Sequence, residues 1–179
     1  MKLKENFQAI DFETKDIYGT KIKLSDYKGK KIHLGFFRNV ACPFCNLRVH
    51  QLTKLREEFE RKGLHSIFFF ESSPQVLLRS SFHQCISPVP LVGDPERTVY
   101  TQYGVESSVF KMLTTLLAKG TVSDMKAGKA LNLPEDKHAT QSLIPADFLI
   151  DQNFVIARAH YGSNINDHIS IEELRAFAG

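Results

Sequence analysis

Residues 32–54 read IHLGFFRNVACPFCNLRVHQLTK, and this stretch decides the fold. Its first part, residues 32–37, is a mostly apolar run that predicts a buried central strand. Cys42-Pro43-Phe44-Cys45 comes directly after it. From Asn46 to Arg61 apolar residues recur at helical spacing, and a Lys-Gly pair ends the pattern. The two cysteines are therefore expected where a strand ends and a helix begins.

Similar patterns extend in both directions from this stretch. Residues 8–24 predict a strand-turn-strand extension, and further strands are expected at 65–70, 88–92, 146–150 and 154–160. Helices are expected from the Ser72-Ser73-Pro74 cap, from Asp94-Pro95 to about 104, over 105–133, and over 169–177. Alternating strands and helices imply a largely parallel sheet, to which the tight turn at 151–153 adds an antiparallel pair. The predicted fold class is α/β, with a mixed central sheet and helices on both faces.

Length and composition set limits on the function. The 179 residues fit one domain, 1–179, with 42% apolar and 24% charged residues. Lys and Arg outnumber Asp and Glu by only three (23 against 20), which does not favour a nucleic-acid partner. No run approaches the roughly 18 apolar residues of a membrane span, and the first residues lack the apolar core of a secretory signal. Three cysteines do not make a disulfide framework, so a reducing, cytoplasmic location is expected.

The position of the cysteine pair suggests its chemistry. Unpaired backbone N–H groups and the helix dipole stabilise negative charge at a helix start, so a cysteine there is favoured as the nucleophilic thiolate. Cys42 is therefore expected to attack, and Cys45, one turn into the helix, to resolve the mixed disulfide. Pro43 is tolerated in the first turn because the N–H that it lacks would be unpaired anyway. Arg38 and Arg48 could add positive charge.

Other uses of the pair stay open. Two thiols could simply pack in the core, or they could bind zinc. A closed zinc site needs four ligands, but the only other cysteine is Cys85, and the seven histidines are scattered. Haem attachment would need a histidine after Cys45, where Asn46 stands. Redox chemistry without a metal or cofactor is the preferred interpretation.

Several stretches together resemble the alkyl hydroperoxide reductase/thiol-specific antioxidant (AhpC/TSA) family of the thioredoxin-like superfamily, in its peroxiredoxin-like branch. They are LSDYKGK (24–30), FFRNVACPFC (36–45), LVGDP (91–95), YGV (103–105) and IPADFLID (144–151). The resemblance covers most of residues 8–178 and fails in a helical insert at about 106–142. It implies a thioredoxin-like fold in which a cis-proline faces the dithiol, and Pro145 matches that position. An ordinary strand-edge proline is the alternative interpretation.

The chain also departs from the family pattern. Peroxiredoxins carry Thr or Ser three residues before the peroxidatic cysteine, where this chain has Asn39 (counted from Cys42) or Cys42 (counted from Cys45). The CPFC sequence, with Pro43 and Phe44 between the thiols, is similar to the glutaredoxin type of dithiol. The buried carboxylate that thioredoxin has on the preceding strand is missing from residues 32–37.

A few further residues are weaker candidates. Arg158 and His160 share one face of the last strand, and Arg158 could stabilise a thiolate or peroxide if that face meets the dithiol; an exposed face is the alternative. Cys85 is expected to pack as a small apolar residue rather than act as a second resolving thiol. His33 is expected to be a hydrogen-bonded core residue rather than a catalytic base. The apolar stripe of residues 109–117 could cover the core or mediate a homodimer.

Three functions follow from these observations. The first is a thiol-disulfide oxidoreductase in which the Cys42 thiolate attacks a disulfide substrate and Cys45 releases the product. The second is a peroxiredoxin-type thiol peroxidase that reduces hydroperoxides through a sulfenic acid. Either enzyme would need a cellular electron donor of the thioredoxin or glutaredoxin type. The third is a non-catalytic module that binds a ligand or a metal.

Overall fold

The computed structural model describes residues 1–86, 88–115, 133–137 and 139–179. Its strands are β1 (Glu13–Lys15), β2 (Lys21–Lys23), β3 (Lys31–Phe36), β4 (Leu64–Phe70), β5 (Leu91–Gly93), β6 (Ala146–Ile150) and β7 (Ile156–Tyr161). Its helices are α1 (Pro43–Lys54), α2 (Arg56–Arg61), α3 (Pro74–Leu77), α4 (Ser81–Gln84), α5 (Thr98–Gln102), α6 (Val109–Thr114) and α8 (Ile171–Ala178), with a 3-10 turn at Leu24–Tyr27. Among these elements, no helix is long and apolar enough to cross a membrane.

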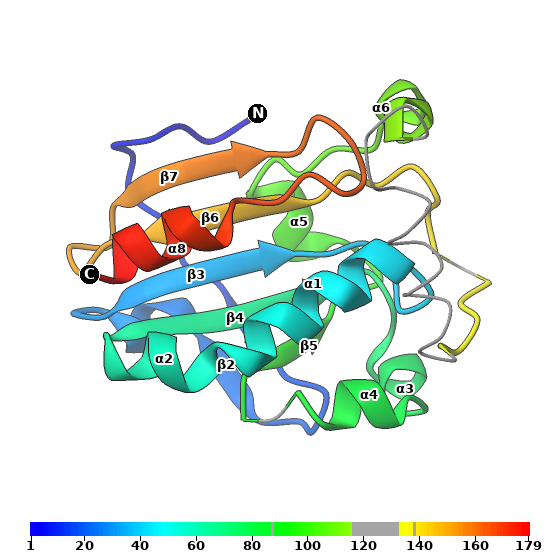
Figure 1. Cartoon of the computed structure of the whole chain (residues 1–179), viewed down its shortest axis with the longest axis horizontal. Coiled ribbons are helices and arrows are strands. Elements are labelled where there is room, and N and C mark those ends of the chain that lie inside the picture. The colour runs from blue at the N-terminus through cyan, green and yellow to red at the C-terminus, as the bar shows by residue number, and fades with distance from the viewer. Residues whose placement is uncertain (87, 116–132, 138) are drawn as a thin grey trace.

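The central sheet is mixed, as the sequence predicts. Its strand order is β5-β4-β3-β6-β7, with β3, β4 and β5 parallel and with β6 and β7 antiparallel to their neighbours. The helices α1, α2 and α8 cover one face, and α5 covers the other together with the β1–β2 ribbon (Figure 1). Both faces are therefore buried, which explains why the inner strands read as nearly continuous apolar runs.

Phenylalanine side chains build both layers of the core. Along β4, Phe68 and Phe70 point toward α1, whereas Phe69 points toward α5, because successive strand side chains alternate between faces. Phe36 of β3 stacks on Phe69 of the neighbouring strand β4, on the same face of the sheet, at a centroid distance of 4.8 Å. Each fully buried phenylalanine contributes about 1.5–3 kcal/mol of transfer free energy. The core that carries the dithiol is thus firmly packed.

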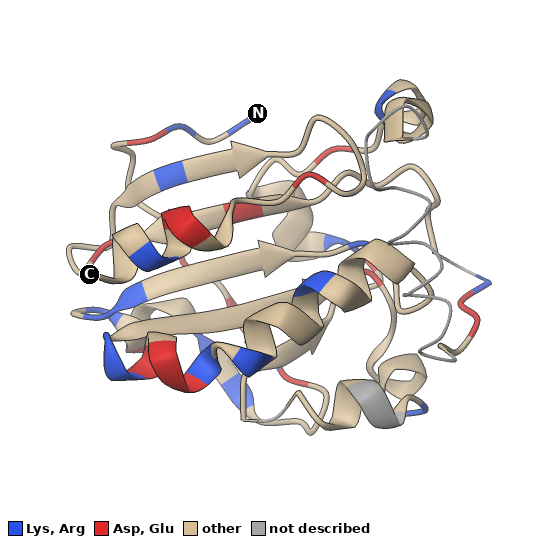
Figure 2. Ribbon diagram, viewed as in Figure 1, with Lys and Arg blue, Asp and Glu red and all other residues tan. Residues whose placement is uncertain are grey.

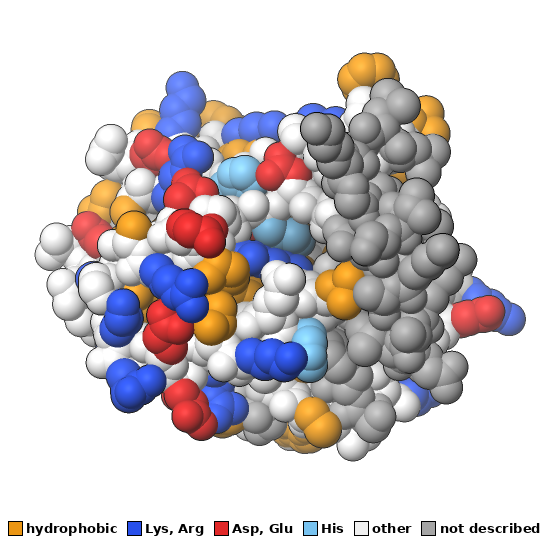
Figure 3. Space-filling view, viewed as in Figure 1, with side chains coloured by type: hydrophobic (Ala, Val, Ile, Leu, Met, Phe, Trp, Pro, Cys, Tyr) orange, Lys and Arg blue, Asp and Glu red, His pale blue; other side chains and the backbone are white. Residues whose placement is uncertain are grey.

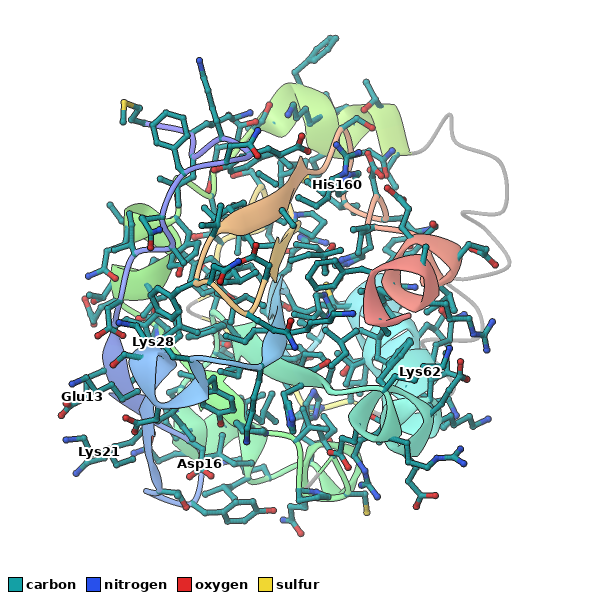
Figure 4. The ribbon with its side chains drawn as sticks, turned by 90° about the vertical axis from the view of Figure 1, so that its left-hand side faces the viewer. Glu13, Asp16, Lys21, Lys28, Lys62 and His160 are labelled. Atoms are coloured by element: carbon teal, nitrogen blue, oxygen red, sulfur yellow. The ribbon has the colours of Figure 1, made fainter. Side chains whose placement is uncertain are left out.

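The N-terminal extension forms the predicted ribbon. β1 pairs antiparallel with β2, and Gly19 takes the left-handed conformation (φ +86°) in the turn between them. Glu13 and Lys21 lie side by side on the outside of this ribbon and form an ion pair of 2.9 Å (Figure 4). The ribbon's apolar face, with Ile22, covers the sheet face opposite α1.

Two predicted helices are interrupted in the structure. The helix expected over 46–61 is two helices that meet at Leu55, whose N–H donates to both Gln51 and Leu52 carbonyls. The helix expected after Ser73 does begin there, with Ser73 Oγ accepting from the Val76 N–H, but it lasts one turn before α4 follows. These breaks carry no glycine or internal proline, so tertiary packing decides them.

The insert begins differently from the prediction. Residues 105–108 are not helical, because Ser107 forms a β-bridge with Leu143 and the N–H of Ser108 donates to the Ser142 carbonyl. Helix α6 starts only after Ser108 and stands at a corner of the molecule (Figure 1). Residues 116–132, the greater part of the helix expected over 105–133, lie outside the described residues.

Charged side chains of both signs are interspersed over the surface. Along α2, Arg56 and Arg61 flank three glutamates, and blue and red segments are scattered over the other elements (Figure 2). Such a surface carries no extended field of one sign.

Candidate redox site

Cys42 and Cys45 lie at the start of α1, as expected. Cys42 is the N-cap residue, Pro43 is the first helical residue, and Cys45 is one turn into the helix. Both cysteines are free thiols and buried, and Cys45 Sγ donates to Cys42 Sγ over 2.8 Å. Phe44, on α1, belongs to the same apolar cluster as the two cysteines. The two sulfurs are therefore close enough for a disulfide bond to form between them.

Arg38 is the cation of the site. It follows β3 in the loop that leads to Cys42 and is 5% exposed. Its Nη1 donates to Cys42 Sγ at 3.3 Å, and its backbone N–H donates to Cys45 Sγ at 3.4 Å. Nη2 donates to the Gln141 carbonyl, which holds the guanidinium over the dithiol. One residue therefore contacts both sulfurs.

The two thiols have different acidities. Burial would raise the pKa of Cys42, but the hydrogen bond from Cys45 and the positive charge of Arg38 outweigh it and lower the pKa to about 6. Burial raises the pKa of Cys45 well above its ordinary value, and the hydrogen bond to Cys42 raises it further. Cys42 is thus mainly a thiolate at neutral pH, and Cys45 is a thiol.

Two polar residues that the sequence did not single out hold the loop before the dithiol. Asn46 Nδ2 donates to the carbonyls of Val40 (2.8 Å) and Cys42 (2.7 Å). Ser72 Oγ, from the loop after β4, accepts the Val40 N–H at 2.9 Å. A single asparagine or serine gives no sequence signal for this role, because its partners are fixed only by the fold.

The segment before β6 reaches the dithiol from the other side. Ile144 is 1% exposed and belongs to the same apolar cluster as Cys42 and Cys45. Pro145 is buried, and its carbonyl accepts the Gly162 N–H at 2.9 Å. Together with the Arg38–Gln141 contact, these positions bring residues 141–145 beside the site; the cis peptide remains a prediction.

Arg158 is not part of the site, which corrects that expectation. Its guanidinium pairs with Glu5 at 2.9 Å and with Glu173 at 3.5 Å, and its side chain is 45% exposed. His160, labelled beside β7 in Figure 4, pairs with Asp167 at 3.0 Å. The register of β7 on the sheet edge turns this face toward the N-terminal segment and α8, so the exposed-face alternative holds.

Cys85 and Arg48 also differ from the expectations. Cys85 follows α4 and is exposed, so it does not pack as an apolar residue. The described contacts of the dithiol do not include it. Arg48 turns away from Cys42, and its Nη2 donates to the Ile169 carbonyl before α8.

A buried polar group lies beneath α8. Asp147 on β6 accepts from His33 Nε2 at 2.8 Å and from His168 Nδ1 at 2.9 Å, and all three side chains are at most 4% exposed. Burial would raise the pKa of Asp147, but the two imidazoles, His168 above all, hold it well below its usual range. His33 is therefore a hydrogen-bonded core residue, as expected. The sequence analysis missed Asp147 and His168.

The fold and site together define a class. The five-stranded mixed sheet and the Cys-x-x-Cys pair at the start of a helix are typical of thioredoxin-like dithiol proteins. The model of the AhpC/TSA family matches residues 6–159. The chain belongs to the AhpC/TSA family.

Similar proteins include both thiol-disulfide oxidoreductases and a protein that is named a peroxiredoxin. The thiol-disulfide oxidoreductase ResA of Halalkalibacterium halodurans is 26% identical over 98 residues, which make up 55% of either chain, so the match spans about half of that relative. A Mycobacterium tuberculosis protein that is named a peroxiredoxin is 22% identical over 91% of this chain and 88% of its own length. The crystal structure of a thiol:disulfide interchange protein DsbE from Chlorobium tepidum superimposes with a TM-score of 0.65, at 19% identity and 99% coverage of both chains.

Proposed function

We propose that the protein is a thiol-disulfide oxidoreductase in which Cys42 is the attacking thiol and Cys45 the resolving thiol. The observation that carries this proposal is the inequivalence of the two sulfurs. Cys42 caps α1 and receives the Arg38 guanidinium, whereas Cys45 is buried one turn deeper and keeps its proton. Thiol-disulfide exchange needs one thiolate that attacks the substrate and one adjacent thiol that later resolves the mixed disulfide.

The reaction balances as a two-electron transfer. The Cys42 thiolate attacks one sulfur of the substrate disulfide, the substrate S–S bond breaks, and one substrate thiolate leaves and takes up a proton. Cys45 loses its proton and attacks Cys42 Sγ, which releases the second substrate thiol and leaves a Cys42–Cys45 disulfide. A reduced dithiol donor, of the thioredoxin or glutaredoxin type, returns the two electrons. Arg38 would stabilise Cys42 as attacking and as leaving group.

A peroxiredoxin-type activity is the second candidate. The relative named a peroxiredoxin, which matches along nearly the whole chain, favours it. The Cys42 thiolate would attack a hydroperoxide, release an alcohol or water, and become a sulfenic acid; Cys45 would condense with it and expel water. Asn39 stands where a hydroxyl would orient the peroxide, and its Oδ1 instead accepts the Ala41 N–H of its own loop. Exchange is therefore preferred.

A metal-binding module is the third candidate. In the described ranges no group of three or more His, Cys, Asp or Glu side chains is arranged to hold a metal ion. Metal that copurifies with the wild-type protein and is lost in Cys42→Ser would favour this alternative.

Parallel oxidation assays test the proposed function. Fully reduced protein is mixed with equimolar bis(2-hydroxyethyl) disulfide or hydrogen peroxide, and the loss of free thiols is followed against free cysteine. We expect the disulfide to oxidise the protein faster than it oxidises cysteine at pH 7, and peroxide to show no such advantage. The opposite pattern would replace exchange by peroxidase activity. No advantage with either reagent would contradict both enzymes.

We also propose a cytoplasmic location. A reducing compartment would keep the dithiol reduced and ready to attack a substrate. Fractionation of the source cells, followed by thiol trapping, tests the location and the redox state together.

A homodimer through α6 is a further proposal. Val109 and Leu113 of the stripe are 60% and 54% exposed, so they do not cover the core, although Met112 packs against it; the neighbouring Phe110 is 77% exposed. We expect Leu113→Asp to shift a dimer toward monomer in sedimentation velocity. Lys111→Asp is no suitable control because Lys111 pairs with Glu106; Phe7→Asp, which changes an exposed apolar side chain in the N-terminal segment, is the better one. An unchanged sedimentation coefficient with an intact fold would contradict the dimer through α6.

A further inference from the structure

A pocket of about 360 Å³ lies between α1 and the segment that leads into α8. One wall is a helical stripe of α1, and the other is the start of α8 with the loop before it; the residues used below are Phe44, Leu47, Arg48, His168, Ile169 and Ser170. Figure 3 views the molecule from this side, with a blue and a pale-blue side chain together between the two helices. The pocket is large enough for a small organic molecule.

Two nitrogen atoms in the pocket lining lack hydrogen-bond partners. Arg48 Nε is buried and unpartnered, although Nη2 of the same guanidinium donates to the Ile169 carbonyl. His168 Nε2 is also buried and unpartnered, and the side chain is 4% exposed. Because His168 Nδ1 faces the Asp147 carboxylate, Nδ1 carries a proton. The Arg48 Nε–H is a buried donor without an acceptor, which is costly, so it indicates that an acceptor is missing beside Arg48.

The charge at the pocket indicates what kind of acceptor. Burial lowers the pKa of Arg48 more than the negative charges of Asp147 and Glu172 raise it. These two carboxylates therefore do not fully compensate the positive charge of the buried guanidinium. A carboxylate is a planar anion that accepts hydrogen bonds from a guanidinium in its own plane, and charge-assisted bonds of this kind are strong. The apolar part of the lining, with Phe44 and Leu47, suits a short carbon chain attached to that group.

The pocket is connected to the dithiol. Phe44, which lines it, is one of the two residues between the cysteines. On the other side, the His168 ring lies 5.0 Å from the ring of Phe37, which belongs to the same apolar cluster as Cys42 and Cys45. A molecule whose carboxylate occupies the pocket would extend past Phe44 toward the start of α1, where the attacking sulfur lies.

We propose that this pocket binds a carboxylate group of a low-molecular-weight disulfide and thereby selects carboxylate-bearing disulfides as substrates of Cys42. The proposal rests on the proposed oxidoreductase function and adds its substrate class. Arg48 is a positioning residue in this account, since it contacts the carboxylate and not the reacting sulfurs, and His168 is part of the pocket wall.

The test compares two disulfides that differ in their end groups. Reduced protein is oxidised by 3,3′-dithiodipropionate, which bears two carboxylates, or by uncharged bis(2-hydroxyethyl) disulfide, at physiological ionic strength to screen distant charges. We expect the wild-type rate ratio to favour the dicarboxylate, relative to the ratio for a free thiol. Arg48→Gln should lower this preference by about tenfold, the effect of one charge-assisted hydrogen bond. Arg48→Lys should restore part of it.

A matched control and an unreactive probe complete the test. Arg61→Gln removes the same charge from an exposed position on α2, outside the pocket, and should leave the ratio unchanged. Binding of 3-(methylthio)propionate, which has the carboxylate but no disulfide, is followed by NMR shifts of the protein. Binding that Arg48→Gln abolishes, with slow reaction of both disulfides, would support the pocket and contradict the oxidoreductase. Fast reaction of both disulfides without preference and without probe binding would overturn the pocket and leave the oxidoreductase standing.

Discussion

Replacement of Cys42 by serine is expected to slow reduction of bis(2-hydroxyethyl) disulfide by at least about 100-fold at pH 7. Serine supplies no thiolate, so only Cys45 could still attack. Burial, the main cause of the raised pKa of Cys45, persists in this variant, so this fully buried thiol is mainly protonated at pH 7. The rate is measured from loss of free thiols, with the fold checked by circular dichroism.

The Cys45→Ser variant should still react, unlike Cys42→Ser, because Cys42 can still attack the substrate disulfide. It should release one equivalent of substrate thiol and stop at a mixed disulfide on Cys42, which mass spectrometry detects. Cys85→Ser, an exposed thiol outside the site, is the matched control and should react like wild type. A trapped adduct in Cys42→Ser rather than in Cys45→Ser would reverse the assigned roles.

The pH profile of the wild-type rate gives an independent check on the mechanism. Because the pKa of Cys42 is lowered to about 6, the rate of the attacking step should rise with pH through about 6 and level off above about 7. An unperturbed thiol would show this rise at about 8.5. A profile centred there would mean that Arg38 does not act on Cys42.

Asp147→Ala is expected to cost about 3–5 kcal/mol of unfolding free energy, because it removes a buried carboxylate that accepts three hydrogen bonds. The substitution removes the shared acceptor of His33 and His168 and that of the Ile169 N–H. The measurement is urea unfolding at pH 7. Asp167→Ala is the control, because this carboxylate also pairs with a histidine but is 28% exposed, so its loss should cost only about 1 kcal/mol.

The difference in unfolding free energy between wild type and Asp147→Ala should become smaller at low pH. The pKa of Asp147 is depressed in the folded state, so its contribution is fully present above the unfolded value of about 3.9 and is lost as pH falls toward the folded value. The stability difference between wild type and Asp147→Ala should therefore shrink as the pH falls below about 4. A difference that stays the same down to about pH 2 would show that the carboxylate is not the stabilising group.

The sequence predicts the architecture well because the strongest local signals agree with the tertiary structure. The buried parallel strands are continuous apolar runs, and Ser170 begins α8 with the capping box that its spacing to Glu173 allows. Pro43 similarly predicts the helix start at the dithiol. The breaks at Leu55 and after α3 escape prediction, because they have no local residue signal and depend on packing between elements.

The candidate site is predictable only where its residues are close in the sequence. Arg38 lies four residues before Cys42, and the loop brings it to the sulfur. Asp147 and His33 are 114 residues apart and meet because β6 pairs with β3. The sequence leaves open whether Arg158 faces the dithiol or an exposed surface for the same reason, since its partner Glu5 is distant in the sequence.

The bridge between Ser107 and Leu143 has a consequence for changes in the length of the insert. It joins the two ends of the insert at its base, so the residues between them form a closed excursion whose length does not set the spacing of α5 and β6. Extending such a loop costs little entropy once its ends are fixed. A change in the length of this part of the chain should therefore leave the sheet intact, but near its end Gln141 contacts Arg38, so such a change would act on the environment of Cys42.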